Sequence, residues 1–185
     1  MKKYYHMNIA GVERDLQLFS VNDNLKIAAF ILFGDVEITV ESAKELLKKV
    51  PDFDIMVTAE AKSIPLIYEM ARQSGRNDYV IARKSSKVYM ENMIKVTVNS
   101  ITTQKEQILC IGDNEVEKIK GKRCLIVDDV ISTGESLSAI EKLIDKAGGN
   151  IVGRAAILAE GDASERNDII YLQKLPLFDK DGNVI

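Results

Sequence analysis

Apolar residues along this chain fall into two patterns, short unbroken runs and longer segments with helical spacing. The runs are unbroken at residues 55–57, 79–82 and 125–127, which predicts strands buried in a parallel sheet, and largely apolar at residues 107–111 and 151–159, which predicts further strands. The helically spaced segments predict helices at residues 40–50, 65–73 and 137–147. Because strands and helices alternate, we expect an α/β fold, with a doubly wound, mostly parallel sheet and helices on both faces.

Residues that begin and end helices support these segments. Thr39 is a candidate N-cap for the first helix, and Pro51 ends that helix. Pro65 fits the first turn of the second helix, and Gly148 lies where the third one stops. We found no repeat, low-complexity tract or linker in the 185 residues, so one domain over residues 1–185 is expected.

Composition and charge exclude several classes of protein. The chain has 25 basic and 28 acidic residues, a formal net charge of −3, whereas a general nucleic-acid binder normally shows a basic excess. A signal peptide and a membrane span are both absent from the pattern, which favours a cytoplasmic protein without a membrane partner. Cys110 and Cys124 lie in apolar runs and are expected to be buried, reduced thiols. The single histidine, His6, gives little support to a zinc site or a histidine-activated nucleophile.

The segment from Cys124 to Ser136 carries the clearest chemistry. It consists of an apolar strand, the acid pair Asp128 and Asp129, and a turn of small residues that opens a helix. Backbone N–H groups at the start of a helix lack intrahelical partners, and the helix dipole favours an anion there. Carboxylates at the carboxyl end of a strand suit vicinal hydroxyls or a metal-bound polyanion. The segment therefore predicts a site for a sugar phosphate.

This segment resembles the 5-phosphoribosyl-1-pyrophosphate (PRPP) signature of the type I phosphoribosyltransferases. The resemblance implies that Asp128 and Asp129 act as catalytic residues on the ribose hydroxyls and that the following loop grips the 5-phosphate. The loop residues are Ser132, Thr133, Gly134, Glu135 and Ser136. The alternative is an ordinary strand, turn and helix with these residues as caps, but capping does not need an acid pair.

Two further loops resemble the family's pyrophosphate-binding segments. Adenine phosphoribosyltransferases have Glu-Ala-Arg-Gly after the first strand of the sheet, and this chain has Glu60, Ala61, Lys62 and Ser63 there. The resemblance implies that Ala61, Lys62 and Ser63 bind pyrophosphate and that Lys62 is also catalytic, although lysine lacks the bidentate fork of arginine. The alternative is a capped helix start with an exposed lysine.

The second such loop follows the next strand and contributes Arg83, Lys84 and Lys87 to the expected pyrophosphate site. Its alternative is a solvated basic loop. Residues 84–104 are polar and irregular apart from a candidate strand at Ile94 to Val98. By resemblance they form the flexible loop that closes the site, while residues 1–38 and the C-terminal region largely form a small hood.

A third resemblance concerns the base pocket. Residues 31–36 resemble the segment of adenine phosphoribosyltransferases that meets the adenine ring, which implies that Leu32 and Phe33 bind the base. Plain core packing is the alternative for Phe33. Glu160 is a further candidate for the base or the hood. The basic loop and Ser100 to Lys105 also resemble xanthine enzymes and PRPP-binding purine repressors, so the base is not fixed as adenine.

The resemblance as a whole implies a purine phosphoribosyltransferase, a homodimer that moves the phosphoribosyl group from PRPP to adenine or another purine. Mg²⁺ is the expected cofactor. It would bridge the diphosphate and the ribose hydroxyls of PRPP near Asp128 and Asp129, without a direct protein ligand. A PRPP-sensing regulator without turnover is a second hypothesis, although no basic excess or DNA-binding segment supports it. PRPP synthetases are longer, and the Gly-Lys-Ser/Thr sequence of a P-loop is absent.

Overall fold

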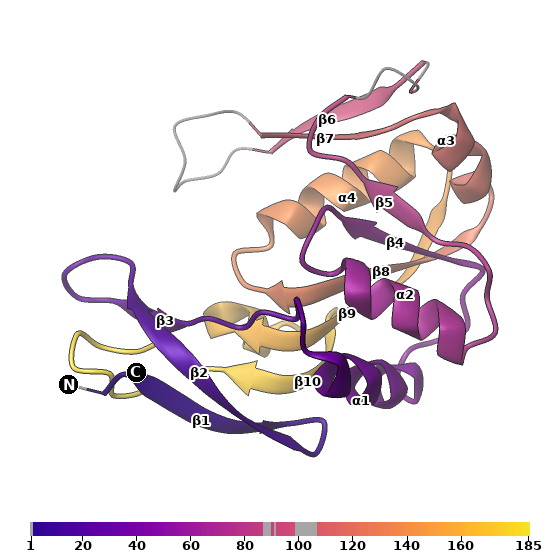
Figure 1. The fold of residues 1–185 in the computed structure, drawn as a ribbon. Coiled ribbons are helices and arrows are strands. Elements are labelled where there is room, and N and C mark those ends of the chain that lie inside the picture. The colour runs from indigo at the N-terminus through magenta and orange to yellow at the C-terminus, as the bar shows by residue number, and fades with distance from the viewer. Residues whose placement is uncertain (1, 87–89, 91, 99–106) are drawn as a thin grey trace.

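A five-stranded parallel sheet forms the centre of the protein (Figure 1), with the strand order β10-β9-β8-β4-β5. In that order the strands span Ile170–Leu175, Asn150–Glu160, Arg123–Ile131, Ile55–Ala59 and Val80–Ala82. This computed structural model describes residues 2–86, 90, 92–98 and 107–185. The sheet confirms the expected α/β class with a mostly parallel sheet.

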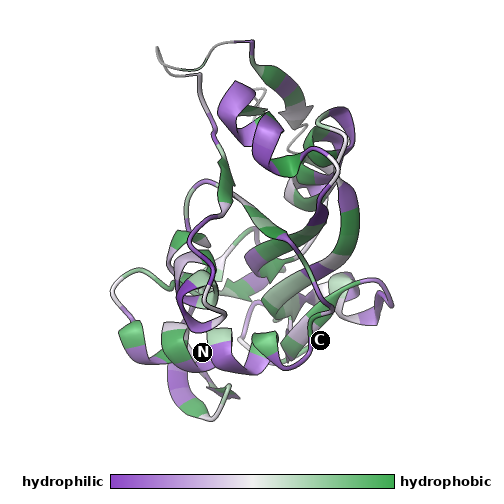
Figure 2. Cartoon of the chain, turned by 90° about the vertical axis from the view of Figure 1, so that its right-hand side faces the viewer, coloured by the Kyte–Doolittle hydropathy of each residue, from purple (hydrophilic) through white to green (hydrophobic). Residues whose placement is uncertain are grey.

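Helices cover both faces of this sheet. Helices α1 (Val36–Leu47) and α2 (Ile64–Gln73) share one hydrophobic cluster with Leu125 and Val127 of β8, and helix α4 (Glu135–Lys146) shares the other with Ile126. Side chains of a strand alternate between the two faces, so β8 is buried on both sides. Figure 2 accordingly shows a largely apolar sheet and helices that carry both apolar and polar bands.

A second, antiparallel sheet lies beside the edge of the parallel sheet that strand β10 forms (Figure 1). It contains β1 (Tyr4–Ile9), β2 (Val12–Ser20) and β3 (Lys26–Ala28) in that order. The C-terminal segment joins it through a bridge between Lys26 and Phe178, so the two chain ends lie close together in Figure 1. Phe178 is fully buried and packs edge-on against Tyr5, with ring centroids 4.9 Å apart.

The strand expected at residues 107–111 is present as β7 (Gln107–Ile111), but it does not join the parallel sheet as a ladder. It pairs antiparallel with β6 (Ile94–Val98) and meets the end of β5 through a bridge between Arg83 and Cys110. The expected alternation was therefore wrong at this point. A short apolar run shows that a segment is a strand but not which partner it takes.

Further differences concern helices and strands that the apolar pattern did not predict correctly. Helix α1 begins at Val36 rather than near residue 40, because the Asp35 carboxylate caps it by accepting the N–H of Ile38 at 3.2 Å. Thr39 is thus inside the helix. The pattern also missed α3 (Asp113–Ile119), β10 and the three strands β1, β2 and β3. Within the described ranges, no helix is long and apolar enough to cross a membrane.

Candidate active site

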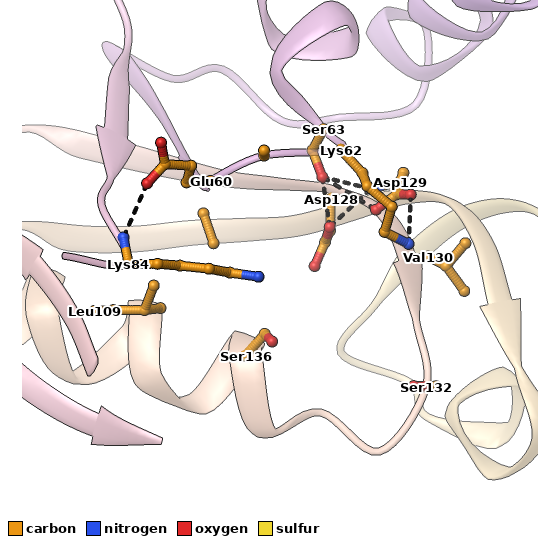
Figure 3. Close-up of a pocket in the computed structure, with 12 residues that line it drawn as sticks. Glu60, Lys62, Ser63, Lys84, Leu109, Asp128, Asp129, Val130, Ser132 and Ser136 are labelled. Atoms are coloured by element: carbon orange, nitrogen blue, oxygen red, sulfur yellow. Dashed lines mark hydrogen bonds and ion pairs between the residues drawn. The ribbon is translucent and has the colours of Figure 1, made fainter. Parts of the chain in front are cut away.

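Three of the predicted segments meet around one cavity of about 240 Å³, at the carboxyl ends of β4, β5 and β8 (Figure 3). The cavity is lined by Ala59, Glu60, Ala61, Lys62, Ser63, Lys84, Leu109, Asp128, Asp129, Val130, Ser132 and Ser136. The carboxyl edge of a parallel sheet is where open α/β folds place their ligands. The structure thus brings together residues that the sequence placed in three separate loops.

The acid pair lies within strand β8 rather than after it. Asp128 is paired with Ala156 in the ladder to β9, which continues to Ile131. The expected end of the strand was therefore too early, because the long neighbouring strand offers partners beyond the apolar run. As successive residues of one strand, Asp128 and Asp129 are held rigidly by the sheet.

Ser63 connects the two acids (Figure 3). Its hydroxyl is 2.6 Å from Asp128 Oδ1 and 3.2 Å from Asp129 Oδ1, and it accepts the Asp129 N–H at 3.0 Å. Ser63 is almost fully buried, so this bridge is shielded from water. Burial, followed by the adjacent charge of Asp129, raises the pKa of Asp128 to about 7, while the hydrogen bond from Ser63 opposes the rise.

Lys62 is the cation next to this pair. Its ammonium lies 3.1 Å from Asp129 Oδ2, a buried oxygen that accepts no hydrogen bond from the residues described here. The ion pair is only partly shielded, because the Lys62 side chain is 54% exposed. Asp129 itself is only 3% exposed, so its charge depends on this cation for compensation. Lys62 thus has one end in solvent at the cavity and its ammonium beside the acid pair.

Glu60 joins the two loops that were expected to bind pyrophosphate. One carboxylate oxygen accepts the N–H of Lys84 at 3.0 Å, and the other lies 3.6 Å from the Arg83 guanidinium. The Lys84 side chain extends into the cavity in Figure 3. The Nε of Arg83 is buried and has no hydrogen-bond partner in the described part of the chain. Lys87, the third cation expected here, lies outside the described residues.

The loop expected to hold the 5-phosphate surrounds a second, smaller cavity of about 50 Å³, which adjoins the first and shares Asp128 with it. Residues 132–136 all line it, and Gly134 takes a left-handed conformation with φ of 81° immediately before α4. A side chain at this φ would be strained, so glycine fits the turn. The unpaired N–H groups at the start of α4 make this cavity suitable for an anion.

The two base candidates lie apart from these cavities. Leu32 is 1% exposed and belongs to the core. Phe33 is 55% exposed and lines a different, mainly apolar groove of about 300 Å³ together with Tyr68. Their roles toward a base stay predictions. Glu160 ends β9. Burial raises the pKa of its carboxyl above the ordinary value, and the charge of Lys62 only partly opposes this rise.

Leu109 of β7 lines the main cavity without having been predicted. No sequence signal could have identified it, since an apolar residue in an apolar strand looks like a core residue. Within the described ranges, no group of three His, Cys, Asp or Glu side chains could hold a metal ion. A divalent cation would thus need oxygen ligands from a bound substrate besides the acid pair.

Comparison with known proteins agrees with this geometry. The chain is 36% identical over 115 residues to a hypoxanthine/guanine phosphoribosyltransferase of Methanococcus voltae, covering 62% of this chain and 57% of that protein. It is 35% identical over 107 residues to an adenine phosphoribosyltransferase of Thermotoga petrophila, covering 58% and 59%. These alignments span less than two thirds of either relative.

A solved structure shows the same fold. It is the adenine phosphoribosyltransferase of Trypanosoma brucei in complex with AMP, pyrophosphate and ribose-5-phosphate, with a TM-score of 0.67, 17% identity, and coverage of 93% of this chain and 76% of that one. The family described as "Phosphoribosyl transferase domain" matches residues 38–179, which include the acid pair, both basic loops and the glycine loop. The chain therefore belongs to the phosphoribosyl transferase domain family.

Proposed function

We propose that this protein transfers the 5-phosphoribosyl group from PRPP to a purine base and releases pyrophosphate. Adenine, which would give AMP, is the first candidate for the base. The observation that carries the proposal is the meeting of the acid pair, the cations of two loops and the glycine loop at one sheet edge. The relatives named above, which act on adenine or on hypoxanthine and guanine by their names, support it.

Each part of the edge suits one part of PRPP. The glycine loop would hold the 5-phosphate with backbone N–H groups and hydroxyls. Asp128 and Asp129 would accept hydrogen bonds from the ribose hydroxyls, because ionised carboxylates are strong acceptors. Lys62, Arg83 and Lys84 would neutralise the pyrophosphate. PRPP would thus lie across both cavities with its anomeric carbon near the acid pair.

Catalysis would be mostly electrostatic. As pyrophosphate leaves, positive charge develops on the ribose ring, and the fixed carboxylates of β8 are already placed to stabilise it. Lys62 would exchange Asp129 for the leaving group, which frees that carboxylate for the ribose. Mg²⁺ fits this donor set, since it commonly binds through phosphates and one or two carboxylates, and when bound it would supply further charge neutralisation.

Hypoxanthine and guanine are alternatives to adenine, because the named relatives differ in their bases. Xanthine is a further alternative, because the basic loop also resembles that of xanthine enzymes. Phe33 remains the candidate for stacking on the base. A homodimer in the cytoplasm stays a prediction from the sequence.

One assay tests the reaction directly. The protein is incubated with PRPP and Mg²⁺ and with adenine, xanthine, hypoxanthine, guanine, uracil or orotate in turn, and pyrophosphate release is followed. We expect release with at least one purine and none with uracil or orotate. PRPP binding without release for any base would instead indicate a regulator, and failure to bind PRPP would reject the proposal.

A further inference from the structure

An arginine from a distant segment touches the glycine loop. Strand β9 is followed by a short 3-10 helix, Gly161–Glu165, and Arg166 comes directly after it. A Cβ atom added to Gly134 would stand 2.9 Å from Arg166 NH1, so the guanidinium lies against the loop backbone. Arg166 is not among the residues of the family signature discussed above, and the apolar pattern gave no reason to select it.

The guanidinium is held in place by charged neighbours. Arg166 donates from Nε and NH2 to the two carboxylate oxygens of Asp168, at 2.9 and 2.8 Å. Asp168 also lies 3.7 Å from Arg154 of β9, which is paired with Glu141 of α4. This chain of ion pairs links the guanidinium to the helix whose first turn forms the loop. Paired charges that support each other in this way fix a side chain better than an isolated surface pair does.

The bidentate pair leaves one nitrogen of Arg166 unused. NH1 forms no hydrogen bond within the part of the chain that the structure describes, and it is the nitrogen that faces Gly134. Arginine is well suited to phosphate because its planar fork keeps donors in fixed directions. The donors of NH1 are thus oriented toward the loop by Asp168.

Among the described residues, two acids, Asp128 and Glu135, line the small cavity, and no lysine or arginine does. Arg166 does not line it either, but its NH1 lies beside Gly134, which does. A sugar phosphate carries close to two negative charges at neutral pH, and backbone N–H groups offset only part of this charge. The positive charge of the neighbouring Arg166 would therefore stabilise a phosphate in this cavity, because the loop itself contains no cation.

We infer that Arg166 is a further binding residue for the 5-phosphate, and that Asp168 positions it there. The inference rests on the proposed function, because it takes PRPP as the ligand. The contact is remote from the anomeric carbon, so it acts on the ground state and the transition state alike. Loss of Arg166 should accordingly raise KM for PRPP and leave kcat nearly unchanged.

The test is titration calorimetry with ribose 5-phosphate, with pyrophosphate and with PRPP on the intact protein in Mg²⁺. We expect Arg166→Gln to weaken ribose 5-phosphate binding by about 10- to 100-fold, as for loss of a charged hydrogen bond, and to leave pyrophosphate binding unchanged. Asp168→Asn should give a smaller loss of the same kind, and Arg166→Lys should keep part of the affinity.

Arg123→Gln is the matched control. Arg123 also forms a two-pronged pair with an aspartate, Asp54, but at the opposite end of β8, and its replacement should leave all three affinities unchanged. Equal ribose 5-phosphate affinities for the wild type, Arg166→Gln and Arg166→Lys would overturn the inference and leave the proposed function standing. An equal loss for ribose 5-phosphate and pyrophosphate would also overturn it. Failure of the wild type to bind PRPP would reject the function itself.

Discussion

Replacing Asp128 with asparagine should make the protein more stable while removing its activity. Asp128 and Asp129 are consecutive acids on a rigid strand, and burial and mutual repulsion disfavour the charged form of Asp128. Asparagine has the same shape, so its side-chain oxygen can still accept from Ser63 and from the Asp129 N–H, which lie 2.6 and 2.9 Å from Asp128 Oδ1. Only the charge is lost.

The size of the effect follows from the pKa. The carboxyl of Asp128 has an ordinary pKa of 3.8, and about 7 in the folded protein. Between these values the folded state binds more protons than the unfolded chain, so the free energy of unfolding decreases as pH rises and stays low above pH 7. The full difference corresponds to about 4 kcal/mol. Because Asp128 faces an open cavity, solvent screening should reduce this to about 2 kcal/mol at pH 8.

Thermal unfolding of the wild type and of Asp128→Asn at several pH values between 4 and 8 measures this effect. The variant should melt about 4–8 °C higher at pH 8, and the difference should disappear near pH 4. Asp54→Asn is the control of opposite sign, because hydrogen bonds from Arg123 lower the pKa of Asp54 to about 2. That variant should lose stability at pH 8. An Asp128→Asn protein that is less stable at pH 8, or whose advantage is the same at all pH values, would refute the reasoning.

Substitutions at three other positions test the site. Asp129→Asn should lower turnover by roughly 10²-fold or more, because a fixed charge is lost where positive charge develops; unchanged kinetics would remove Asp129 from the catalytic groups. Thr133→Val should weaken PRPP binding by about 1.5–3 kcal/mol in titration calorimetry, and equal affinities would contradict the phosphate loop. Lys62→Ala should slow both the forward reaction and pyrophosphorolysis, whereas Lys62→Arg should keep part of the activity. Full activity of the alanine variant in both directions would show that Lys62 is only a solvated residue at the helix start.

The sequence predicted local structure well where one short segment contains the whole signal. Helix α2 and strand β4 were found nearly at their observed bounds, because proline and an unbroken apolar run act within a few residues. The start of α1 was missed because Asp35 competes with Thr39 as the cap. Arg14 of β2 pairs with Asp35 at 2.7 Å, a contact between distant segments that no local pattern contains.

The same limit applies to the site. Asp128, Asp129 and the glycine loop follow one another in the chain, and the structure shows them around adjoining cavities. The bridge from Ser63 to both acids depends on how β4 and β8 pair, which the sequence does not specify. Phe33 was selected by a local match as well, and it lines a different groove, so its role toward a base stays a prediction.

The alkylation rates of the two buried thiols, Cys110 and Cys124, report how often the protein opens. Both thiols are buried, and burial raises the pKa of Cys110 and raises that of Cys124 to about 11. Because the thiolate is the reactive species, an alkylating reagent reacts with either cysteine only after local or global unfolding. Cys110 exchanges two backbone hydrogen bonds with Arg83 at the edge of the site, whereas Cys124 lies in the central strand. Labelling rates at Cys110 therefore measure how often the edge of the site beside Arg83 detaches, and rates at Cys124 measure how often the central sheet unfolds.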